Sequence, residues 1–342
     1  MARTEISTLG EFGLIRHLTE KIKLKNASSI KGIGDDAAVL DYKDKKILVT
    51  TDLLLEGVHF DLIYVPLKHL GYKSAVVNFS DVYAMNGQPK QITVSLGISK
   101  RFSIEDLEEF YAGLQLACDV YGVDLVGGDT SASLTGFTIS ITCIGEGEKD
   151  KIVYRNGAKE NDLICVSGDL GAAYMGLQLL EREKSVFKGE KDFQPDFSGK
   201  EYLLERQLKP EARKDIVEIL YKAGIVPTSM IDISDGLSSE LLHISKESNV
   251  GCRIFEERLP VDYQTAVMAE EFNMNYCSAA LNGGEDYELL FTVPLGFHDA
   301  VSGMKGIKVI GHITKPEYGN TLVGRDGGEI ELKAQGWQTL TE

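Results

Sequence analysis

This sequence of 342 residues lacks the short motifs that would assign a chemistry directly. It contains no G-x-x-x-x-G-K-[ST] loop, which excludes a P-loop kinase, and no G-x-S-x-G elbow, so acyl transfer has no candidate nucleophile. Its six histidines form no H-E-x-x-H pair, which leaves a zinc hydrolase with little support. The five cysteines lie far apart and form no C-x-x-C pair. We therefore expect reduced, mostly buried thiols rather than disulfides or a zinc knuckle.

Long apolar runs and positive charge are also scarce. No apolar stretch reaches ~18 residues, and the first thirty residues lack the apolar core of a signal peptide. The sequence thus predicts a soluble, cytoplasmic protein that is not exported. With 36 Lys and Arg against 52 Asp and Glu, the net charge is −16, which disfavours nucleic acid and anionic membranes as partners. A ligand that carries phosphate would therefore need cations.

The length and the order of patterns predict two domains of mixed α/β structure. A chain of 342 residues exceeds the ~250–300 at which one core stops growing, and a hydrophobic content of 43% allows a sizeable core. Segments typical of strands alternate with segments typical of helices along the chain. The charged turn Glu146–Lys151 marks the predicted boundary between domains at 1–148 and 149–342.

Apolar runs bounded by turn residues predict strands, and apolar residues at helical spacing between capping residues predict helices. Gly127–Asp129 is predicted as a tight turn, and the charged stretch Glu181–Lys200, which has no period, as a long exposed loop with a helical edge. The predicted strands are 46–52, 91–98, 124–126, 136–145, 162–167 and 230–233, and the predicted helices are 72–86, 103–121, 210–224 and 237–248.

Aspartates gather at strand ends, glycine turns and helix starts in this chain. Any one of them alone is typical of an ordinary turn or helix cap. Seven in such settings differ, because carboxylate oxygens are the ligands that Mg²⁺ prefers, and Mg²⁺ commonly bridges them to substrate phosphates. The set predicts a metal–phosphate site and consists of Asp35, Asp36, Asp52, Asp81, Asp129, Asp232 and Asp235.

The segments around these aspartates each have an alternative interpretation. GIGDDA matches only the start of a dinucleotide fingerprint, and its two carboxylates would repel a bare pyrophosphate. In IDISDGL, Ser234 and Asp235 suit a helix cap as well as they suit a ligand. GGEDYEL brings Glu285 to a glycine turn, which is a moderate signal. His59, as a lone histidine, is more typical of a structural residue.

The chain resembles the thiamine-monophosphate kinases in seven ordered segments: GIGDDAAVL, TTDLLLEGVHF, AVVNFSDVYAMNGQP, LVGGDT, YRNGA, IDISDGLSSEL and GGEDYEL. The resemblance runs from about residue 10 to the C-terminus. GGDT alone is shared with aminoimidazole ribonucleotide synthetase, selenophosphate synthetase and a hydrogenase maturation factor, whereas EGVHF and GGEDYEL make the combination more specific. The resemblance implies a two-domain α/β fold like that of aminoimidazole ribonucleotide synthetase, with N-terminal sheets that pair across a homodimer into a barrel.

The same resemblance implies an activity and assigns residues to it. The reaction would be ATP + thiamine phosphate → ADP + thiamine diphosphate, with ATP and several Mg²⁺ ions bound near the dimer interface. The implied metal ligands are Asp36, Thr50, Thr51, Asp52, Asp81, Asp129, Asp232 and Asp235. The implied nucleotide contacts are Gly128, Asp129, Arg155 and Ser234, and the implied thiamine phosphate contacts are His59, Glu285 and Trp337.

The implied mechanism is direct in-line transfer without a covalent enzyme intermediate. Because the acceptor phosphate has a second pKa near ~6, it needs no strong general base, and repulsion between two anions is the main obstacle. Two other functions remain open: an ATP-using relative that phosphorylates an amide or a selenide, and a non-catalytic, metal-dependent nucleotide-binding protein. The absence of cysteine before Cys118 argues against a selenophosphate synthetase.

Overall fold

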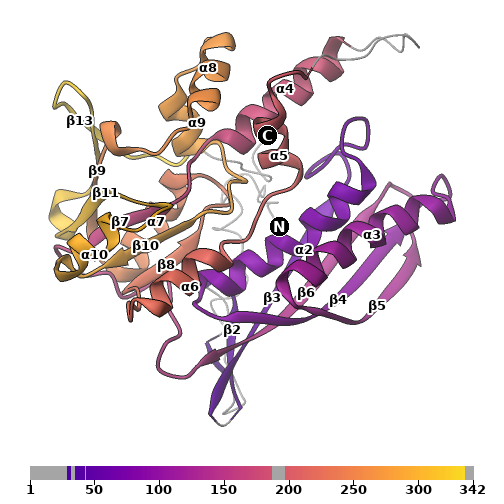
Figure 1. Cartoon of the computed structure of the whole chain (residues 1–342), viewed down its shortest axis with the longest axis horizontal. Helices are drawn as coiled ribbons and strands as arrows, with labels where there is room; N and C mark the ends of the chain where they lie inside the picture. The colour runs from indigo at the N-terminus through magenta and orange to yellow at the C-terminus, as the bar shows by residue number, and fades with distance from the viewer. Residues whose placement is uncertain (1–28, 32–34, 43, 187–196, 336–342) are drawn as a thin grey trace, which may run out of the picture.

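The computed structural model describes residues 29–31, 35–42, 44–186 and 197–335, which form two mixed sheets with helices between and around them. Figure 1 shows the first sheet and its helices on one side of the molecule and the second sheet on the other. The strands of the first sheet lie within 29–148 and those of the second within 163–331. Among the described residues, no helix is long and apolar enough to cross a membrane.

The first sheet has the strand order β1-β2-β3-β6-β4-β5 and is antiparallel except for the β4–β5 pair. Helices α2 (Leu67–Ala84) and α3 (Ile104–Tyr121) cover one of its faces (Figure 1). Burial alternates along β3, β4 and β6, as expected where only one face is covered. The strands are β1 (Ser29–Lys31), β2 (Ala38–Tyr42), β3 (Lys45–Leu55), β4 (Gln88–Ile98), β5 (Asp124–Ala132) and β6 (Thr138–Glu148).

The two helices on this sheet are stabilised in different ways. The hydroxyl of Ser103 accepts a hydrogen bond from the backbone N–H of Asp106 at 3.2 Å, and α3 ends at Gly122 with φ +71, as the sequence predicts. α2 has no side-chain cap, but fourteen of its 18 residues are buried. The helices approach closely at Gly113, where a Cβ would lie 1.8 Å from the backbone oxygen of Lys68. Packing therefore holds α2 in place.

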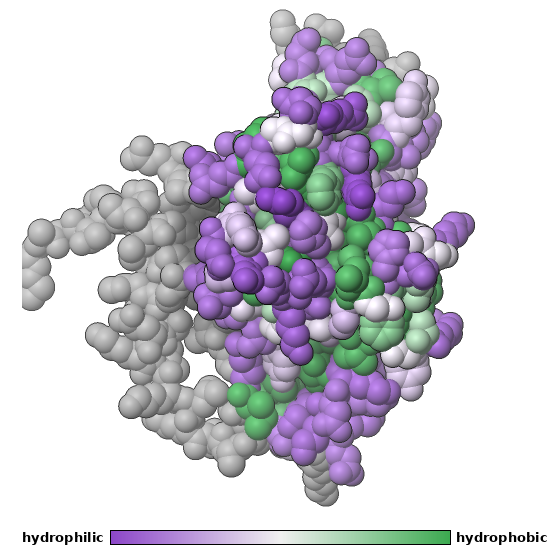
Figure 2. All heavy atoms as spheres, turned by 90° about the vertical axis from the view of Figure 1, so that its left-hand side faces the viewer, coloured by the Kyte–Doolittle hydropathy of each residue, from purple (hydrophilic) through white to green (hydrophobic). Residues whose placement is uncertain are grey.

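The second sheet has the strand order β13-β12-β9-β11-β7-β10-β8. β7, β10 and the edge strand β8 are buried along their whole length. Figure 2 views this side of the molecule and shows mainly hydrophilic residues with hydrophobic ones between them. The strands are β7 (Leu163–Ser167), β8 (Ser229–Asp232), β9 (Gly251–Phe255), β10 (Leu289–Val293), β11 (Ile307–Thr314), β12 (Asn320–Val323) and β13 (Glu329–Glu331).

Seven α-helices and three short 3₁₀ helices of the described chain accompany the second sheet. The α-helices are α4 (Ala172–Val186), α5 (Glu201–Leu208), α6 (Lys214–Lys222), α7 (Leu237–Ser248), α8 (Tyr263–Glu271), α9 (Tyr276–Asn282) and α10 (His298–Ser302). The 3₁₀ helices are η2 (Glu256–Arg258), η3 (Leu295–Phe297) and η4 (Pro316–Tyr318).

The main hydrophobic cluster extends from the first sheet to the second. It contains Phe79 of α2 as well as Phe291 of β10. Polar contacts cross in the same region, since the hydroxyls of Tyr72 and Tyr121 donate to the carboxylate of Glu211 at 2.9 and 2.6 Å. The helix layer between the sheets is thus packed against both of them. All five cysteines are free and buried, as the sequence predicts.

Three predicted elements differ from the structure. Gly127–Asp129 is not a tight turn, because these residues pair in register with β4 and continue β5. The helix predicted from Pro210 begins only at Lys214. The helix predicted at 72–86 is shifted toward the N-terminus, since α2 spans Leu67–Ala84. The helical edge predicted for Glu181–Lys200 is present, since α4 continues to Val186. Most elements after residue 250 were not predicted, because their patterns are short and have no clear period.

Candidate functional site

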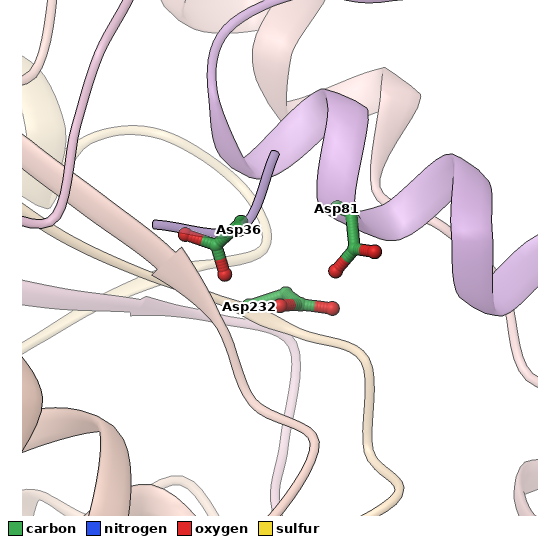
Figure 3. Close-up of side chains that lie close together, drawn as sticks. All are labelled: Asp36, Asp81 and Asp232. Atoms are coloured by element: carbon green, nitrogen blue, oxygen red, sulfur yellow. The ribbon is translucent and has the colours of Figure 1, made fainter. Parts of the chain in front are cut away.

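Three carboxylates from distant parts of the chain meet where the two halves of the protein contact each other. Asp36 precedes β2, Asp81 lies near the end of α2, and Asp232 ends β8. One ligand oxygen from each lies within 4.8 Å of the others, and Figure 3 shows the three side chains pointing toward one another. We call these three residues the carboxylate cluster. All of them belong to the set of aspartates singled out from the sequence.

Donor groups hold each carboxylate of the cluster in place. Thr50 donates its hydroxyl hydrogen to Oδ2 of Asp81 at 2.5 Å, and Ser80 donates to Oδ2 of Asp232 at 2.6 Å. The guanidinium of Arg155 donates to both oxygens of Asp36, at 3.0 and 2.8 Å. A bidentate contact of this kind fixes the carboxylate plane as well as its position. The cluster is thus oriented by its neighbours before any ligand binds.

Asp35 takes a different direction from its neighbour Asp36. It accepts a hydrogen bond from the backbone N–H of Arg155 at 3.2 Å and lies 3.6 Å from the ammonium of Lys31. Burial, with a smaller contribution from the charge of Asp36, raises the pKa of Asp35 to about 6. Asp35 is therefore paired with Lys31 and the backbone of Arg155 and is not one of the three acids of the carboxylate cluster.

Burial and mutual repulsion raise the pKa values of the clustered acids. Burial, followed by the charge of Asp36, raises the pKa of Asp232 to about 7. Burial, with the charges of Asp52, Asp232 and Asp36, raises the pKa of Asp81 well above its ordinary value. Burial also raises the pKa of Asp52 to about 6, and its Oδ2 is a buried atom without a hydrogen-bond partner in the described chain. Crowded carboxylates with an unsatisfied oxygen fit a hard divalent cation.

Successive side chains of β3 point to opposite faces of the sheet, and this alternation separates the predicted metal ligands Thr50 and Thr51. Thr50 and Asp52 point to the face covered by α2, where the carboxylate cluster lies. Thr51 points to the opposite face, where its hydroxyl accepts a hydrogen bond from Thr142 at 3.2 Å. Within the described chain, Thr51 is therefore directed away from the cluster.

Asp129 also lies away from the cluster, on the edge strand β5. It pairs with Ser95 of β4, so two further strands, β4 and β6, separate it from β3. Its neighbour Gly128 must be glycine, because a Cβ there would lie 2.0 Å from the backbone oxygen of Val94. The close pairing of β5 with β4 depends on this glycine.

This part of β5 lines a pocket of about 490 Å³. It contains Gly128 and Asp129, two of the four predicted nucleotide contacts, whereas Arg155 and Ser234 are not among its lining residues. Tyr111 of α3 also lines the pocket. Tyr111 was not predictable as a site residue, because it is one residue in an ordinary amphipathic helix. The remaining lining residues are Leu125, Gly127 and Thr130.

The segments IDISDGL and GGEDYEL lie side by side next to the cluster. The backbone N–H of Glu285 donates to the backbone oxygen of Ser234 at 2.6 Å, and that of Tyr287 donates to Ile233 at 2.9 Å. The backbone N–H of Asp235 donates to the carboxylate of Glu240, at 3.0 Å. Both segments therefore lie close to Asp232, which is one of the predicted metal ligands.

Glu240 is an acid near the cluster that was not predicted from the sequence as a site residue. It is buried in α7, and burial, followed by the charge of Asp235, raises its pKa well above the ordinary value. Its Oε2 has no hydrogen-bond partner within the described chain. Glu240 orients the turn that carries Asp235 through the backbone of that residue.

His59 lies in the turn after β3, and the backbone N–H of Leu55 donates to its Nδ1 at 3.0 Å. Since Nδ1 accepts a hydrogen bond, the neutral ring carries its proton on Nε2, which is then a donor. The third residue implied for thiamine phosphate, Trp337, lies outside the described residues.

Comparison with known proteins places this geometry in a family. Residues 34–146 match the model of the AIR synthase related protein, N-terminal domain. The chain is 38% identical to the thiamine-monophosphate kinase of Aquifex aeolicus over 289 residues, which cover 84% of this chain and 87% of that protein. It is 33% identical to the thiamine-monophosphate kinase of Escherichia coli strain K12 over 338 residues, which cover 96% and 97% of the two chains.

Solved structures lead to the same family. AaThiL complexed with AMPPCP and TMP has a TM-score of 0.84 at 35% identity, covering 99% of this chain and 100% of that chain. HypE in the HypE–HypF complex, at 20% identity and a TM-score of 0.71, shares the fold alone. Since relatives above 30% identity cover more than four fifths of the chain, it belongs to the thiamine-monophosphate kinase family.

Proposed function

We propose that this protein transfers the terminal phosphoryl group of ATP to thiamine monophosphate, giving ADP and thiamine diphosphate. Its family membership and the likeness to a kinase complexed with AMPPCP and TMP support the two substrates. The observation that carries the proposal is the carboxylate cluster, because it brings together one aspartate from each of three family segments: GIGDD, NFSD and IDISD. Phosphoryl transfer between two anions needs such a charge-compensating site.

Divalent cations, with Mg²⁺ as the ion that carboxylate and phosphate oxygens favour, are proposed as cofactors of this site. Asp36, Asp52, Asp81 and Asp232 would hold them, and the unpartnered buried oxygen of Asp52 supports that assignment. When bound, the cations would offset the negative charge of two phosphate groups brought into contact. The roles of Thr51, Asp129 and Asp235 as further ligands stay predictions.

The chain's own residues supply orientation rather than covalent chemistry. Thr50 and Ser80 each fix one carboxylate of the cluster, and Arg155 places a permanent positive charge at its edge. Some of the N–H groups of Arg155 would donate hydrogen bonds to a nucleotide phosphate, as the family resemblance implies. The acceptor phosphate, with a second pKa near ~6, attacks as an oxyanion and needs no general base. Positioning thus accounts for most of the proposed catalysis.

We also propose a homodimer in which the first sheets close into a barrel. In the described chain β5 is an edge strand, and residues 50–55 of β3 pair with β6 on one side but extend beyond β2 on the other. Two such free edges on one sheet suit a twofold pairing of β5 with the partner's β3. This pairing would bring Asp129 of one subunit beside Thr51 and Asp52 of the other.

Two further features of the proposal concern the chain as a whole. The division into domains at 1–148 and 149–342 is supported by the separate strands of the two sheets, although the hydrophobic cluster runs between them. A cytoplasmic location is supported by five free, buried cysteines, which suit a reducing compartment.

The first test is release of ADP by the purified protein from ATP and Mg²⁺. The acceptors are thiamine monophosphate, free thiamine or none, with EDTA as the control. We expect ADP and thiamine diphosphate in equal amounts, only with the monophosphate and Mg²⁺. Silence with every acceptor would favour a different acceptor or a binding role, and unchanged turnover in EDTA would exclude the cation site.

A further inference from the structure

Glu285 differs from the other two acids of GGEDYEL. The side chain of Glu285 is 31% exposed, whereas those of Asp286 and Glu288 are 0% and 1% exposed and form ion pairs with Arg206. The backbone of Glu285 has φ +58, a left-handed conformation that costs a residue with a Cβ about 1 kcal/mol or more. The turn therefore directs one carboxylate outward and keeps its two neighbours inside.

A buried ammonium and a buried amide meet on one oxygen of this carboxylate. Lys73 of α2 is 5% exposed, and its Nζ lies 3.1 Å from Oε2 of Glu285 and 3.0 Å from the backbone oxygen of Gln207. The side-chain nitrogen of Gln207, a buried residue of α5, donates to the same Oε2 at 2.8 Å. Both donors thus serve Oε2, and neither serves Oε1.

The orientation of Gln207 shows that its amide serves the carboxylate. With its nitrogen toward Oε2, its own Oε1 is buried without a hydrogen-bond partner in the described chain. The opposite orientation would place two oxygens against each other, so the contact with Glu285 determines the choice. A glutamine whose only role was packing would be expected to pair both ends of its buried amide, whereas Gln207 leaves its oxygen unpaired in order to donate to Glu285.

Glu285 lies close to the carboxylate cluster. Its backbone contacts Ser234, two residues beyond Asp232. Burial, followed by the charge of Glu285, raises the pKa of Tyr287. The backbone contact with Ser234 places the half-buried carboxylate of Glu285 within reach of a molecule whose phosphate is at the cluster.

α2 sets the distance between these two positions. Lys73 and Asp81 are eight residues apart on the helix, which corresponds to ~12 Å along its axis. A phosphorylated acceptor with its phosphate at the cluster would extend its far end toward Glu285. On the proposed function, that far end is a heteroaromatic ring system with a positive charge and an amino group, which suits a carboxylate oxygen.

We infer that Lys73 and Gln207 are positioning residues, which hold Oε2 of Glu285 so that Oε1 faces the ring system of the acceptor. This inference rests on the proposed function and assigns acceptor recognition to a buried pair that touches neither substrate. Loss of either donor frees the carboxylate to rotate, and the acceptor then binds less tightly while ATP binding is unaffected.

The test compares Lys73→Met with Lys68→Met, an exposed lysine on the same helix, by steady-state kinetics. We expect Lys73→Met to raise the KM for thiamine monophosphate about tenfold or more, with the KM for ATP within about twofold of the parent and kcat changed less than the acceptor KM. Lys73→Arg, which keeps a donor, is expected to recover part of the loss. Gln207→Leu is expected to give a smaller increase in the same KM.

A double-mutant cycle shows whether Lys73 acts through Glu285. In a Glu285→Gln background, Lys73→Met is expected to add little further increase in the acceptor KM. Full additivity, or an unchanged or lower acceptor KM in a folded Lys73→Met variant, would overturn the inference. If Lys73→Met does not fold, the acceptor KM values of Lys73→Arg and Gln207→Leu decide in its place. An increased acceptor KM supports the inference, and an unchanged or lower one overturns it. An inactive parent enzyme would instead refute the proposed function, so the two failures are distinct.

Discussion

Asp232→Asn is expected to abolish turnover and, at the same time, to stabilise the metal-free protein above neutral pH. Asp232 is 4% exposed, and its pKa is raised to about 7 by burial and by the charge of Asp36. Asn keeps the acceptor oxygen for the hydroxyl of Ser80 and removes only the charge. An acid kept for function alone should behave in this way, because the fold gains nothing from its ionised form.

The sign and the size follow from the pKa. Between about pH 4 and pH 7, the folded protein holds a proton on Asp232 that the unfolded chain has released, so the free energy of unfolding falls as pH rises through this window. A folded pKa of about 7 against an ordinary 3.8 corresponds to at most roughly 4 kcal/mol at pH 8. Because the pKa of the neighbouring Asp81 is also raised and the two acids influence each other, we expect the variant to gain part of this amount, a few kcal/mol.

Urea unfolding in EDTA from pH 5 to pH 8 measures this effect, with Asp150→Asn, an exposed turn residue, as the matched control. The parent should lose stability across the window, and Asp232→Asn should lose less. Added Mg²⁺ should stabilise the parent at pH 8 by mass action and stabilise the variant less. A variant that is less stable than the parent at pH 8 in EDTA, or that gains as much from Mg²⁺, would refute the reasoning.

Three further changes test other parts of the structure. Ser80→Ala removes the hydroxyl donor to the β8 carboxylate and should lower kcat about tenfold, whereas Ser80→Thr, which keeps a hydroxyl, should lower it less; steady-state rates decide. Gly113→Ala places a Cβ 1.8 Å from a backbone oxygen of α2 and should reduce the free energy of unfolding by roughly 2 kcal/mol or more, while Gly296→Ala, which has open space, should change it little in urea. Asp36→Asn and Asp129→Asn should each be inactive alone. If the site is shared between subunits, a mixture refolded together should recover about a quarter of the parent activity, because half of the dimers are mixed and each carries one intact site. No recovery in any mixture would place Asp36 and Asp129 in the same subunit's site.

Residue type and motif were enough to single out the three acids of the carboxylate cluster as candidates. Asp36, Asp81 and Asp232 each stand at a turn, near a helix end or at a strand end. Their convergence was not predictable from spacing, since it depends on α2 being packed between the two halves of the protein. Strand alternation then divides neighbours that a motif treats alike: Thr50 faces Asp81, and Thr51 faces away.

Residues that act through others gave no signal in the sequence. Lys73 and Glu240 are single charged residues in helices, where an exposed position is the ordinary expectation. Burial and partners, which only the folded chain provides, distinguish them. The two glycines of β5 led to a wrong prediction of a turn. Gly127 and Gly128 are typical of a turn, but the close approach of β4 gives Gly128 its role.

α2 contacts both ends of the proposed acceptor site. Lys73 reaches Glu285 near its start, and Ser80 and Asp81 serve the carboxylate cluster near its end. Because most of α2 is buried, its residues keep fixed rotamers and a fixed separation. A change that tilts α2, such as a larger residue at Gly113, should therefore weaken acceptor binding and turnover together, although Gly113 lies on α3 and is packed against the backbone of α2 rather than against a substrate. Rigidity of this helix, more than any single ligand contact, links recognition of the ring system to the position of the phosphate.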